Sequence, residues 1–373
     1  MLVGPNGAGK TAVLEAVLHL ATGSSHRTSA DAVLVRHGAE TATAQGRVVQ
    51  DDRLAVLERQ VRAGGARVRL DGRAVRPREV AGLLRAVLAS PEDLELVRGE
   101  PAVRRRLWDD LAVARRPTVA GARADVERAL RQRAQLLRSA RAVPRAARPA
   151  ALATLEAWDA QLLPAAAELV RARLDVLAEV AGPVAEAAAG LGLDPLVLRP
   201  HLSWVDDEAV GPDDGPAADE GEDEGRAGAA LAVPRPDEVE GLLAAALERR
   251  RDVDLDRGAT TVGPHRDDLL LELGGGPART WASQGQARGV ALALRLGSHR
   301  LLGDDGREAV LLLDDVFADL DVLRRERLAE RCAATEQVLL TATDATGVVE
   351  GLHARTWQVE VGGVEPSARR PAG

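Results

Sequence analysis

The feature that most constrains this chain is a glycine-rich loop near its start. The loop reads Gly4-Pro5-Asn6-Gly7-Ala8-Gly9-Lys10-Thr11. It matches G-x-x-x-x-G-K-[ST] in full, and apolar residues at helical spacing follow over 13–18. In such a loop the glycines turn backbone N–H groups toward phosphates, the lysine reaches the β- and γ-phosphates, and the threonine binds Mg²⁺. Residues 4–11 are therefore predicted to bind ATP with Mg²⁺.

Composition singles out two residues of this loop. Lys10 is the only lysine among 373 residues, and Asn6 is the only asparagine. A bias toward GC-rich codons explains the general shortage of lysine and asparagine. It does not explain why the only lysine and the only asparagine lie four positions apart in one loop. Arginine is planar and forked, whereas lysine carries a compact charge on a flexible stem. A site shaped for a point charge among phosphates rejects arginine, so we interpret Lys10 as functionally constrained.

Charge and cysteine usage bear on partners and location. The net charge of −8 at first argues against nucleic acid, but residues 206–225 hold ten Asp or Glu and no Arg, and the rest is slightly basic. A basic face elsewhere is therefore allowed. We interpret residues 206–237 as a disordered loop insertion that acts as a solvated spacer. The single Cys332, the absence of a long apolar run and the absence of a leader before the loop predict a cytoplasmic protein without membrane association.

The order of local patterns predicts an α/β protein with a helical insertion. Expected elements are antiparallel strands over 41–79 with a hairpin turn at 71–72, helical spacing over 80–88, a helical hairpin or small bundle over 115–200, a helix over 239–250, and buried parallel strands over 310–313 and 337–340. Gly and Ser at 23–25 are expected to end the helix after the glycine-rich loop. Because only three residues precede this loop, we expect that one or two N-terminal strands are missing.

Two acids follow the apolar run 311–313, and they are candidates for metal binding and catalysis. An acid at the end of a buried strand can hold Mg²⁺ opposite Thr11, which is the role predicted for Asp314. Asp315 is then placed to orient or deprotonate the attacking water. The alternative is a pair of aspartates in an ordinary turn, and the glycine-rich loop in the same chain favours the functional interpretation.

A third motif, Ser283-Gln284-Gly285-Gln286, opens an apolar helix. Ser283 can cap this helix, and the exposed amides and dipole at its start can receive an anion. The alternative is a plain helix cap. The order of the motifs along the chain, with the glycine-rich loop first, then S-x-G-Q, then the acidic strand end, favours a nucleotide-binding role.

These three motifs in this order resemble the ATP-binding-cassette (ABC) ATPases. The resemblance implies an ABC-type head with a mixed sheet, flanking helices and an antiparallel β subdomain, interrupted by an α-helical arm. It implies that Ser283, Gln284, Gly285 and Gln286 of one subunit cover the γ-phosphate held by another, so that ATP drives homodimerisation. By the same resemblance residues 316–321 cross the dimer interface. Thr343 and Asp344 occupy the place of the usual switch histidine and are candidate γ-phosphate sensors.

Further motifs resemble the RecF family of bacterial recombination-repair ATPases over nearly the whole chain. They lie at residues 23–28, 90–94, 99–105, 263–268 and 283–286. This resemblance implies slow, DNA-stimulated ATP hydrolysis, binding to duplex DNA near single-strand gaps, and work with RecR and RecO in loading RecA. Arg104, Arg105 and Arg106 are candidate DNA contacts because arginines bind phosphates. The implied domains are an N-terminal head part at 1–113, an arm at 114–257 and a C-terminal head part at 258–373.

Two other classes compete with a repair ATPase. A nucleotide-binding subunit of an ABC transporter shares the motifs, but Lys10 and Ser283 are separated by a helical arm, and transporter cassettes are compact. A structural clamp of the SMC type needs a long heptad coiled coil, for which residues 115–200 are too short.

Overall fold

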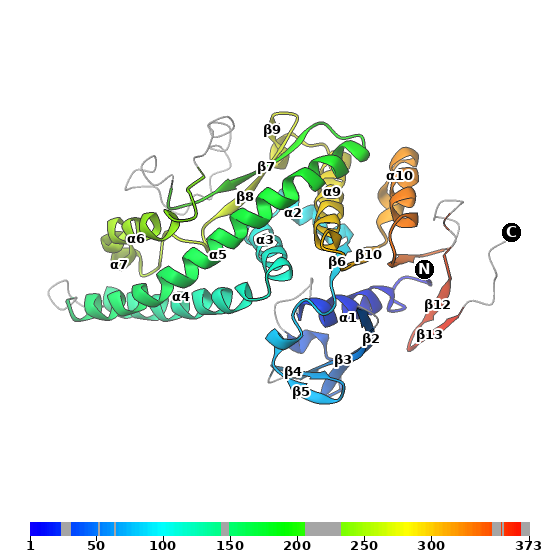
Figure 1. Cartoon of the computed structure of the whole chain (residues 1–373), viewed down its shortest axis with the longest axis horizontal. Helices are drawn as coiled ribbons and strands as arrows, with labels where there is room; N and C mark the ends of the chain where they lie inside the picture. Colours follow the sequence, from blue (N-terminus) through cyan, green and yellow to red (C-terminus); the bar gives the residue numbers. More distant parts are fainter. Residues whose placement is uncertain are drawn as a thin grey trace. The chain divides into compact units, whose positions relative to one another are not determined.

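A computed structural model describes residues 1–23, 31–50, 53–62, 65–142, 149–205, 233–344, 352 and 354–366. These residues form two compact units (Figure 1). Unit 1 comprises Met1–Val97, Gly182–Pro195 and Ser283–Gly373, and unit 2 comprises Arg98–Ala181 and Leu196–Ala282. Packing thus places residues 98–113 and 258–282, which the sequence assigns to the head, with the helical unit. The domain boundaries predicted from the sequence, at 113/114 and 257/258, therefore stay a prediction.

Unit 1 is built on a mixed six-stranded sheet with the order β13-β12-β1-β11-β10-β6. Its strands are β1 (Leu2–Val3), β6 (Ala86–Ala89), β10 (Val310–Asp314), β11 (Val338–Ala342), β12 (Trp357–Glu360) and β13 (Gly363–Pro366). All neighbours are parallel except β12 and β13. The short β1 lies between β11 and β12, so the residues before the glycine-rich loop do form a strand. The carboxyl ends of β1 and β10 therefore lie at the same edge of the sheet.

Helices pack against this sheet because their apolar faces cover its buried strands. Unit 1 contains α1 (Lys10–Thr22), α9 (Gln284–Gly303) and α10 (Val322–Ala333), together with most of α2 (Leu94–Arg98) and the end of α5 (Pro149–Gly190). Short 3₁₀ turns are η1 (Asp31–Leu34), η2 (Pro77–Glu79), η3 (Pro91–Asp93) and η7 (Val316–Asp319). Leu14 of α1, fully buried, packs with Leu88 and Leu312 of the sheet. The predicted buried strands at 310–313 and 337–340 are confirmed.

A second, antiparallel sheet in unit 1 has the order β2-β3-β4-β5. The strands are β2 (Thr41–Gln50), β3 (Arg53–Arg62), β4 (Gly65–Leu70) and β5 (Arg73–Val75), as predicted for residues 41–79. Asp71 and Gly72 both adopt positive φ, 50° and 78°, which is the geometry of a tight type I′ hairpin turn. One face of this sheet packs against the end of α1 through Leu20, Val48 and Leu57.

Unit 2 is mainly helical, with a small sheet. It contains α3 (Pro101–Arg115), α4 (Val119–Arg141), most of α5 (Pro149–Gly190), α6 (Val239–Arg249), α7 (Arg251–Arg257), α8 (Ala278–Trp281) and the antiparallel strands β7 (Leu196–His201), β8 (Asp268–Leu273) and β9 (Gly276–Pro277). The helices predicted within 115–200 are confirmed by α4 and α5, except that residues 196–200 belong to strand β7, and α6 confirms the helix predicted at 239–250. Pro164 lies within α5, which continues through it.

Buried ion pairs connect the elements of unit 2. The Arg173 guanidinium donates to Asp109 at 2.6 Å and to the Pro264 carbonyl at 2.7 Å, and it lies over the Trp108 ring. Arg173 also contacts Asp267 at 3.4 Å, but burial dominates and raises the pKa of Asp267 to about 6. Such pairs are tolerated inside a protein only where further hydrogen bonds satisfy both charges.

The helix predicted over 80–88 is wrong, and most of the insertion predicted over 206–237 is not described by the structure. Residues 80–88 do not form a helix: they contain a turn at Gly82, with φ of 79°, followed by the buried strand β6. Apolar spacing cannot distinguish a short buried strand from a helix segment. The predicted disordered insertion lies outside the described residues over 206–232. No helix among the described residues is both long and apolar enough to span a bilayer.

Candidate nucleotide-binding site

The glycine-rich loop connects β1 to α1, as the motif requires. Gly7 and Gly9 adopt φ of 81° and 107°, which side chains other than hydrogen strongly disfavour. Gly4 has a different reason to be glycine, because a Cβ atom there would lie 2.2 Å from the Val359 carbonyl oxygen of β12. The loop is therefore shaped both by its own turn and by the neighbouring strand.

Lys10 is buried at the start of α1. Its Nζ donates hydrogen bonds to the Gly4 carbonyl at 2.6 Å and to the Pro5 carbonyl at 3.1 Å. The amine at the end of the loop thus contacts the backbone at the start of the loop. A cation in this position can meet a phosphate that enters the loop.

Asp314, at the end of β10, meets the first turn of α1. The Thr11 hydroxyl donates to Asp314 Oδ2 at 2.7 Å, and Thr341 of β11 donates to Asp314 Oδ1 at 2.7 Å. Asp314 is 5% exposed, so both carboxylate oxygens are held in place by hydroxyl groups. Thr341 was not among the residues predicted from the sequence. The one feature that could have indicated it is that a polar residue directly follows the apolar run 338–340 of the adjacent strand.

Asp315 follows in a left-handed backbone conformation, with φ of 52°. Its N–H donates to Thr341 Oγ1 at 2.9 Å, so Thr341 fixes both acids. A non-glycine residue in this conformation is uncommon, and such strain concentrates at functional sites. The turn gives the two acids different surroundings: Asp314 is buried, whereas Asp315 is half-buried at the same edge of the sheet.

The donor set around Thr11 fits Mg²⁺. This ion is bound in nucleotide sites by one or two protein oxygens, with phosphates and water as its other ligands. Thr11 Oγ1 and Asp314 Oδ2 are hard oxygen donors only 2.7 Å apart. No group of three or more His, Cys, Asp or Glu side chains that could hold a metal ion occurs in the described part of the chain.

The segment 283–286 forms the start of α9. Ser283 and Gln286 form a reciprocal capping box: Gln286 N–H donates to Ser283 Oγ at 3.3 Å, and Ser283 N–H donates to Gln286 Oε1 at 2.9 Å. The predicted cap is confirmed. Ser283, Gln284 and Gly285 are exposed. The backbone at this helix start is therefore presented to solvent.

The segment after Asp315 combines buried anchors with exposed apolar side chains. Phe317 and Leu320 are buried, and Asp321 caps α10 by accepting from Arg324 N–H at 2.9 Å. Val322 and Leu323, at the start of α10, are 70% and 53% exposed. The candidate sensors Thr343 and Asp344 are exposed residues directly after β11.

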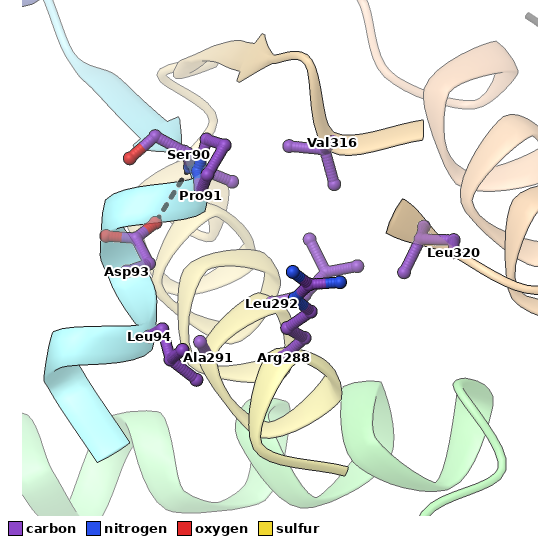
Figure 2. Close-up of a pocket in the computed structure, with 10 residues that line it drawn as sticks. Ser90, Pro91, Asp93, Leu94, Arg288, Ala291, Leu292, Val316 and Leu320 are labelled. Atoms are coloured by element: carbon purple, nitrogen blue, oxygen red, sulfur yellow. Dashed lines mark hydrogen bonds between the residues drawn. The ribbon is translucent and has the colours of Figure 1, made fainter. Parts of the chain in front are cut away.

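Figure 2 shows a pocket in unit 1 that is lined in part by helix α9 and in part by the segment after Asp315. Its lining includes Ser90 and Asp93 near η3, Arg288 on α9, and Val316 and Leu320 after Asp315. Ser90 N–H donates to Asp93 Oδ2 at 2.9 Å. No residue of the glycine-rich loop lines this pocket, so it is not the phosphate site.

The arginines proposed as DNA contacts differ in their surroundings. Arg104 is buried and forms a two-point ion pair with Asp268, at 2.8 and 2.7 Å. The prediction that Arg104 contacts DNA is therefore wrong, because its guanidinium is buried inside unit 2 and bonded to Asp268. Arg105 donates to the Asp267 carbonyl at 2.7 Å, and Arg106 lies 3.9 Å from Asp110. DNA contacts by these two arginines stay predictions.

His265 is part of the same interior. Its Nε2 lies 3.0 Å from the Thr260 carbonyl oxygen. Burial, together with the nearby positive charges of Arg266, Arg105 and Arg133, lowers the pKa of His265 to about 4, although the hydrogen bond to the Thr260 carbonyl opposes the shift. The imidazole is therefore neutral at physiological pH and belongs to the packing of unit 2.

The sheet order, the glycine-rich loop and the Thr11–Asp314 contact define a P-loop nucleotide-binding head of the α/β class. A family model described as the RecF/RecN/SMC N terminal domain matches residues 1–358. A "DNA replication and repair protein RecF" of Frankia alni is 46% identical over 368 residues, 97% of this chain and 92% of the relative. The protein of the same description from Streptomyces avermitilis is 45% identical over 355 residues, 94% of this chain and 89% of the relative. The chain therefore belongs to the RecF family, within the ABC/SMC-like ATPases.

Solved structures agree with this fold. The recombination mediator protein RecF of the RecFOR pathway, described as RecF-ATPrS, has a TM-score of 0.81 at 23% identity, covering 98% of this chain and 91% of that one. The structure described as RecF-ATP has a TM-score of 0.80 at 24% identity and the same coverage. These likenesses confirm the predicted α/β head with an antiparallel sheet.

Proposed function

We propose that this protein is an ATP-dependent DNA-binding protein of recombinational repair and replication restart. The observation that carries the proposal is the array in which Thr341 and Thr11 hold both oxygens of Asp314 beside the P-loop. This array is suited to a nucleotide with its metal and has no evident use in a plain structural turn. The names of relatives that are 45–46% identical supply the biological context.

ATP and Mg²⁺ are the proposed ligands. The backbone amides of residues 4–9 and the Lys10 amine would hold the phosphates, and Thr11 and Asp314 would hold the metal. Mg²⁺ would neutralise charge on the β- and γ-phosphate oxygens. The Thr11–Asp314 hydrogen bond keeps both donors together before any ligand binds, which lowers the cost of ordering them.

Asp315 is the proposed base for slow ATP hydrolysis. The half-buried Asp315 follows the metal-binding acid at the same edge of the sheet, and its backbone is anchored by Thr341. An aspartate that orients water or accepts its proton suits hydrolysis without a covalent intermediate. DNA would stimulate turnover by favouring the state in which the water and the γ-phosphate are aligned.

An ATP-dependent homodimer is the proposed assembly. Residues 283–285 are exposed at a helix start, where amides can meet the γ-phosphate bound by another copy. Val322 and Leu323 are apolar yet exposed, and they directly follow the segment expected to cross the interface. Exposed apolar groups of this kind favour a contact that excludes water.

The proposed partners are duplex DNA near single-strand gaps and RecR, with RecO and RecA acting downstream. The proposed location is the cytoplasm. Cys332 is buried, and burial raises the pKa of its thiol to about 12, so it is suited to remaining a reduced packing residue.

Binding to gapped duplex DNA with ATP, ADP and no nucleotide tests the proposal. We expect the tightest binding with ATP, accompanied by dimers in size-exclusion chromatography. Indifference to DNA in all three states would overturn the repair function. Tight association with membrane subunits would instead favour the alternative, an ABC transporter subunit.

A further inference from the structure

The antiparallel sheet β2–β5 has two chemically different faces. Side chains alternate between faces along each strand, and directly paired residues share a face. The inner face carries Val48, Leu57 and Val68, which pack with Leu20 of α1. The opposite face, here called the basic face, carries the exposed residues Arg47, Arg62, Arg67 and Arg69. Figure 1 shows α1 beside this sheet, and the inner face supplies the buried side chains that pack with Leu20 of that helix.

Among the residues that the structure describes, few acidic groups neutralise the charge on the basic face. Glu58 is the only acidic residue in strands β2–β5, and it lies 3.6 Å from Arg69. Within the described residues, Arg47, Arg62 and Arg67 take part in no ion pair. Asp51 and Asp52, outside the described residues, precede β3, whereas Arg62 ends it. A chain with net charge −8 therefore keeps a cluster of positive charge on one sheet face.

The chemistry of this face suits a phosphate backbone more than exposed bases. Strands β2–β5 contain no Phe, Trp or Tyr, so the face offers no platform on which single-stranded bases could stack. Neutral hydrogen-bonding side chains, Thr41, Thr43 and Gln60, lie between the arginines and can also contact phosphates. At about 3.4 Å per residue, β2 spans about 34 Å, close to one turn of duplex DNA.

One residue ties this sheet to the nucleotide site. Arg59 points inward from β3, is 5% exposed, and its Nε donates to the Leu20 carbonyl in the last turn of α1 at 3.3 Å. A cation at a helix C-terminus is favourable for the helix dipole. The strand that carries Arg62 outward is thus fastened to the helix that begins at the P-loop.

We propose that the basic face binds the phosphate backbone of duplex DNA. This inference rests on the proposed DNA-binding function and assigns it a surface. Each arginine that contacts a phosphate releases a counterion, so binding through this face weakens steeply with salt. The basic face lies in the same unit as the proposed nucleotide site, and Arg59 connects this sheet to the helix that begins at that site.

The triple variant R47Q/R62Q/R67Q tests the assignment. Affinity for a 30-base-pair duplex is measured by fluorescence anisotropy between 50 and 300 mM salt, with ATP present. Losing three phosphate contacts should reduce the slope of log affinity against log salt by about 3 and lower affinity about 100-fold at 0.15 M salt. ATP binding and ATP-driven dimerisation should be unchanged.

The matched control is R128Q/R131Q/R138Q, which removes the same charge from exposed positions on α4, where Arg128 and Arg131 lie near acids. It should change the slope by less than about 1. If the triple variant is unstable on thermal melting, Arg67→Gln alone should still reduce the slope by about 1.

Wild-type binding with an unchanged slope in the triple variant would overturn the surface assignment and leave the proposed function intact. A loss confined to single-stranded DNA would also overturn it. Failure of the wild-type protein to bind gapped or intact duplex in any nucleotide state would overturn the proposed function and this inference together.

Discussion

Thr11 Oγ1 donates a hydrogen bond to Asp314 Oδ2 at 2.7 Å, although the two residues lie 303 positions apart in the chain. The contact joins the first turn of the P-loop helix to the end of β10. It exists because β1 and β10 are parallel strands of one sheet, with β11 between them, so their carboxyl ends lie at a common edge. Thr341, at the end of β11, completes the array from that intervening strand.

Asp314→Asn should remove most of the effect of Mg²⁺ on ATP affinity, because an amide replaces the one carboxylate beside Thr11. Thr341→Val should weaken the Mg²⁺-dependent part about 10- to 100-fold, since Thr341 orients Asp314. Nucleotide binding is measured with excess Mg²⁺ and with EDTA. Asp321→Asn, on the cap of α10, serves as the control. An Asp314→Asn variant that keeps the full Mg²⁺ effect would contradict the assigned ligand.

Lys10→Arg should abolish ATP-driven dimerisation. The planar guanidinium is larger than the amine that now donates to Gly4 and Pro5, and it cannot reproduce a compact charge within the loop. Size-exclusion chromatography with and without ATP provides the measurement, and circular dichroism checks the fold. ATP-dependent dimers at the wild-type level would show that Lys10 does not have the proposed role.

Asp315→Asn should preserve ATP binding and lower turnover by about 10²- to 10⁴-fold, the usual contribution of a positioned acid or base. The amide keeps the size of the side chain but cannot accept a proton. ATP affinity and steady-state phosphate release separate the two effects. Turnover at the wild-type rate would remove Asp315 from the catalytic residues.

Arg104→Met should destabilise the protein by about 3–5 kcal/mol, because it leaves the buried Asp268 carboxylate unpaired. Arg106→Gln, the control, should change stability by less than about 0.5 kcal/mol. Urea unfolding measures both. The double variant R104M/D268L should recover much of the loss, because an apolar pair often replaces a buried ion pair at little cost. A double variant no more stable than R104M would contradict this account.

His265 predicts a specific pH dependence of stability. Its pKa is lowered to about 4 in the folded protein from 6.5, so its contribution is present above pH 6.5 and is lost as pH falls toward 4. His265→Gln lacks this loss. The stability difference between wild type and variant should therefore shift in favour of the variant by roughly 3 kcal/mol between pH 7 and 4. A pH-independent difference in urea unfolding would exclude a buried neutral His265.

Local patterns predicted much of the fold. The glycine-rich loop, the strands of residues 41–79 with their Asp71-Gly72 turn, and the capped helix after Ser283 each depend on residues close together in the chain. Residues 80–88 were predicted incorrectly because their apolar spacing fits a helix and a buried strand equally well. The burial of that segment beside β10 decided for the strand.

The sequence by itself determined which residues form the phosphate loop, because Lys10, its glycines and Thr11 act within a single turn. Only the tertiary structure decided which partners complete the site and which charges are available. Strand order places Thr341 beside Asp314 in the site. The buried ion pair with Asp268 shows that Arg104 is not available to contact DNA. The nearby Val359 carbonyl of β12 explains why residue 4 must be a glycine. Each of these depends on contacts between residues far apart in the chain, which sheet order and burial create and which local pattern cannot specify.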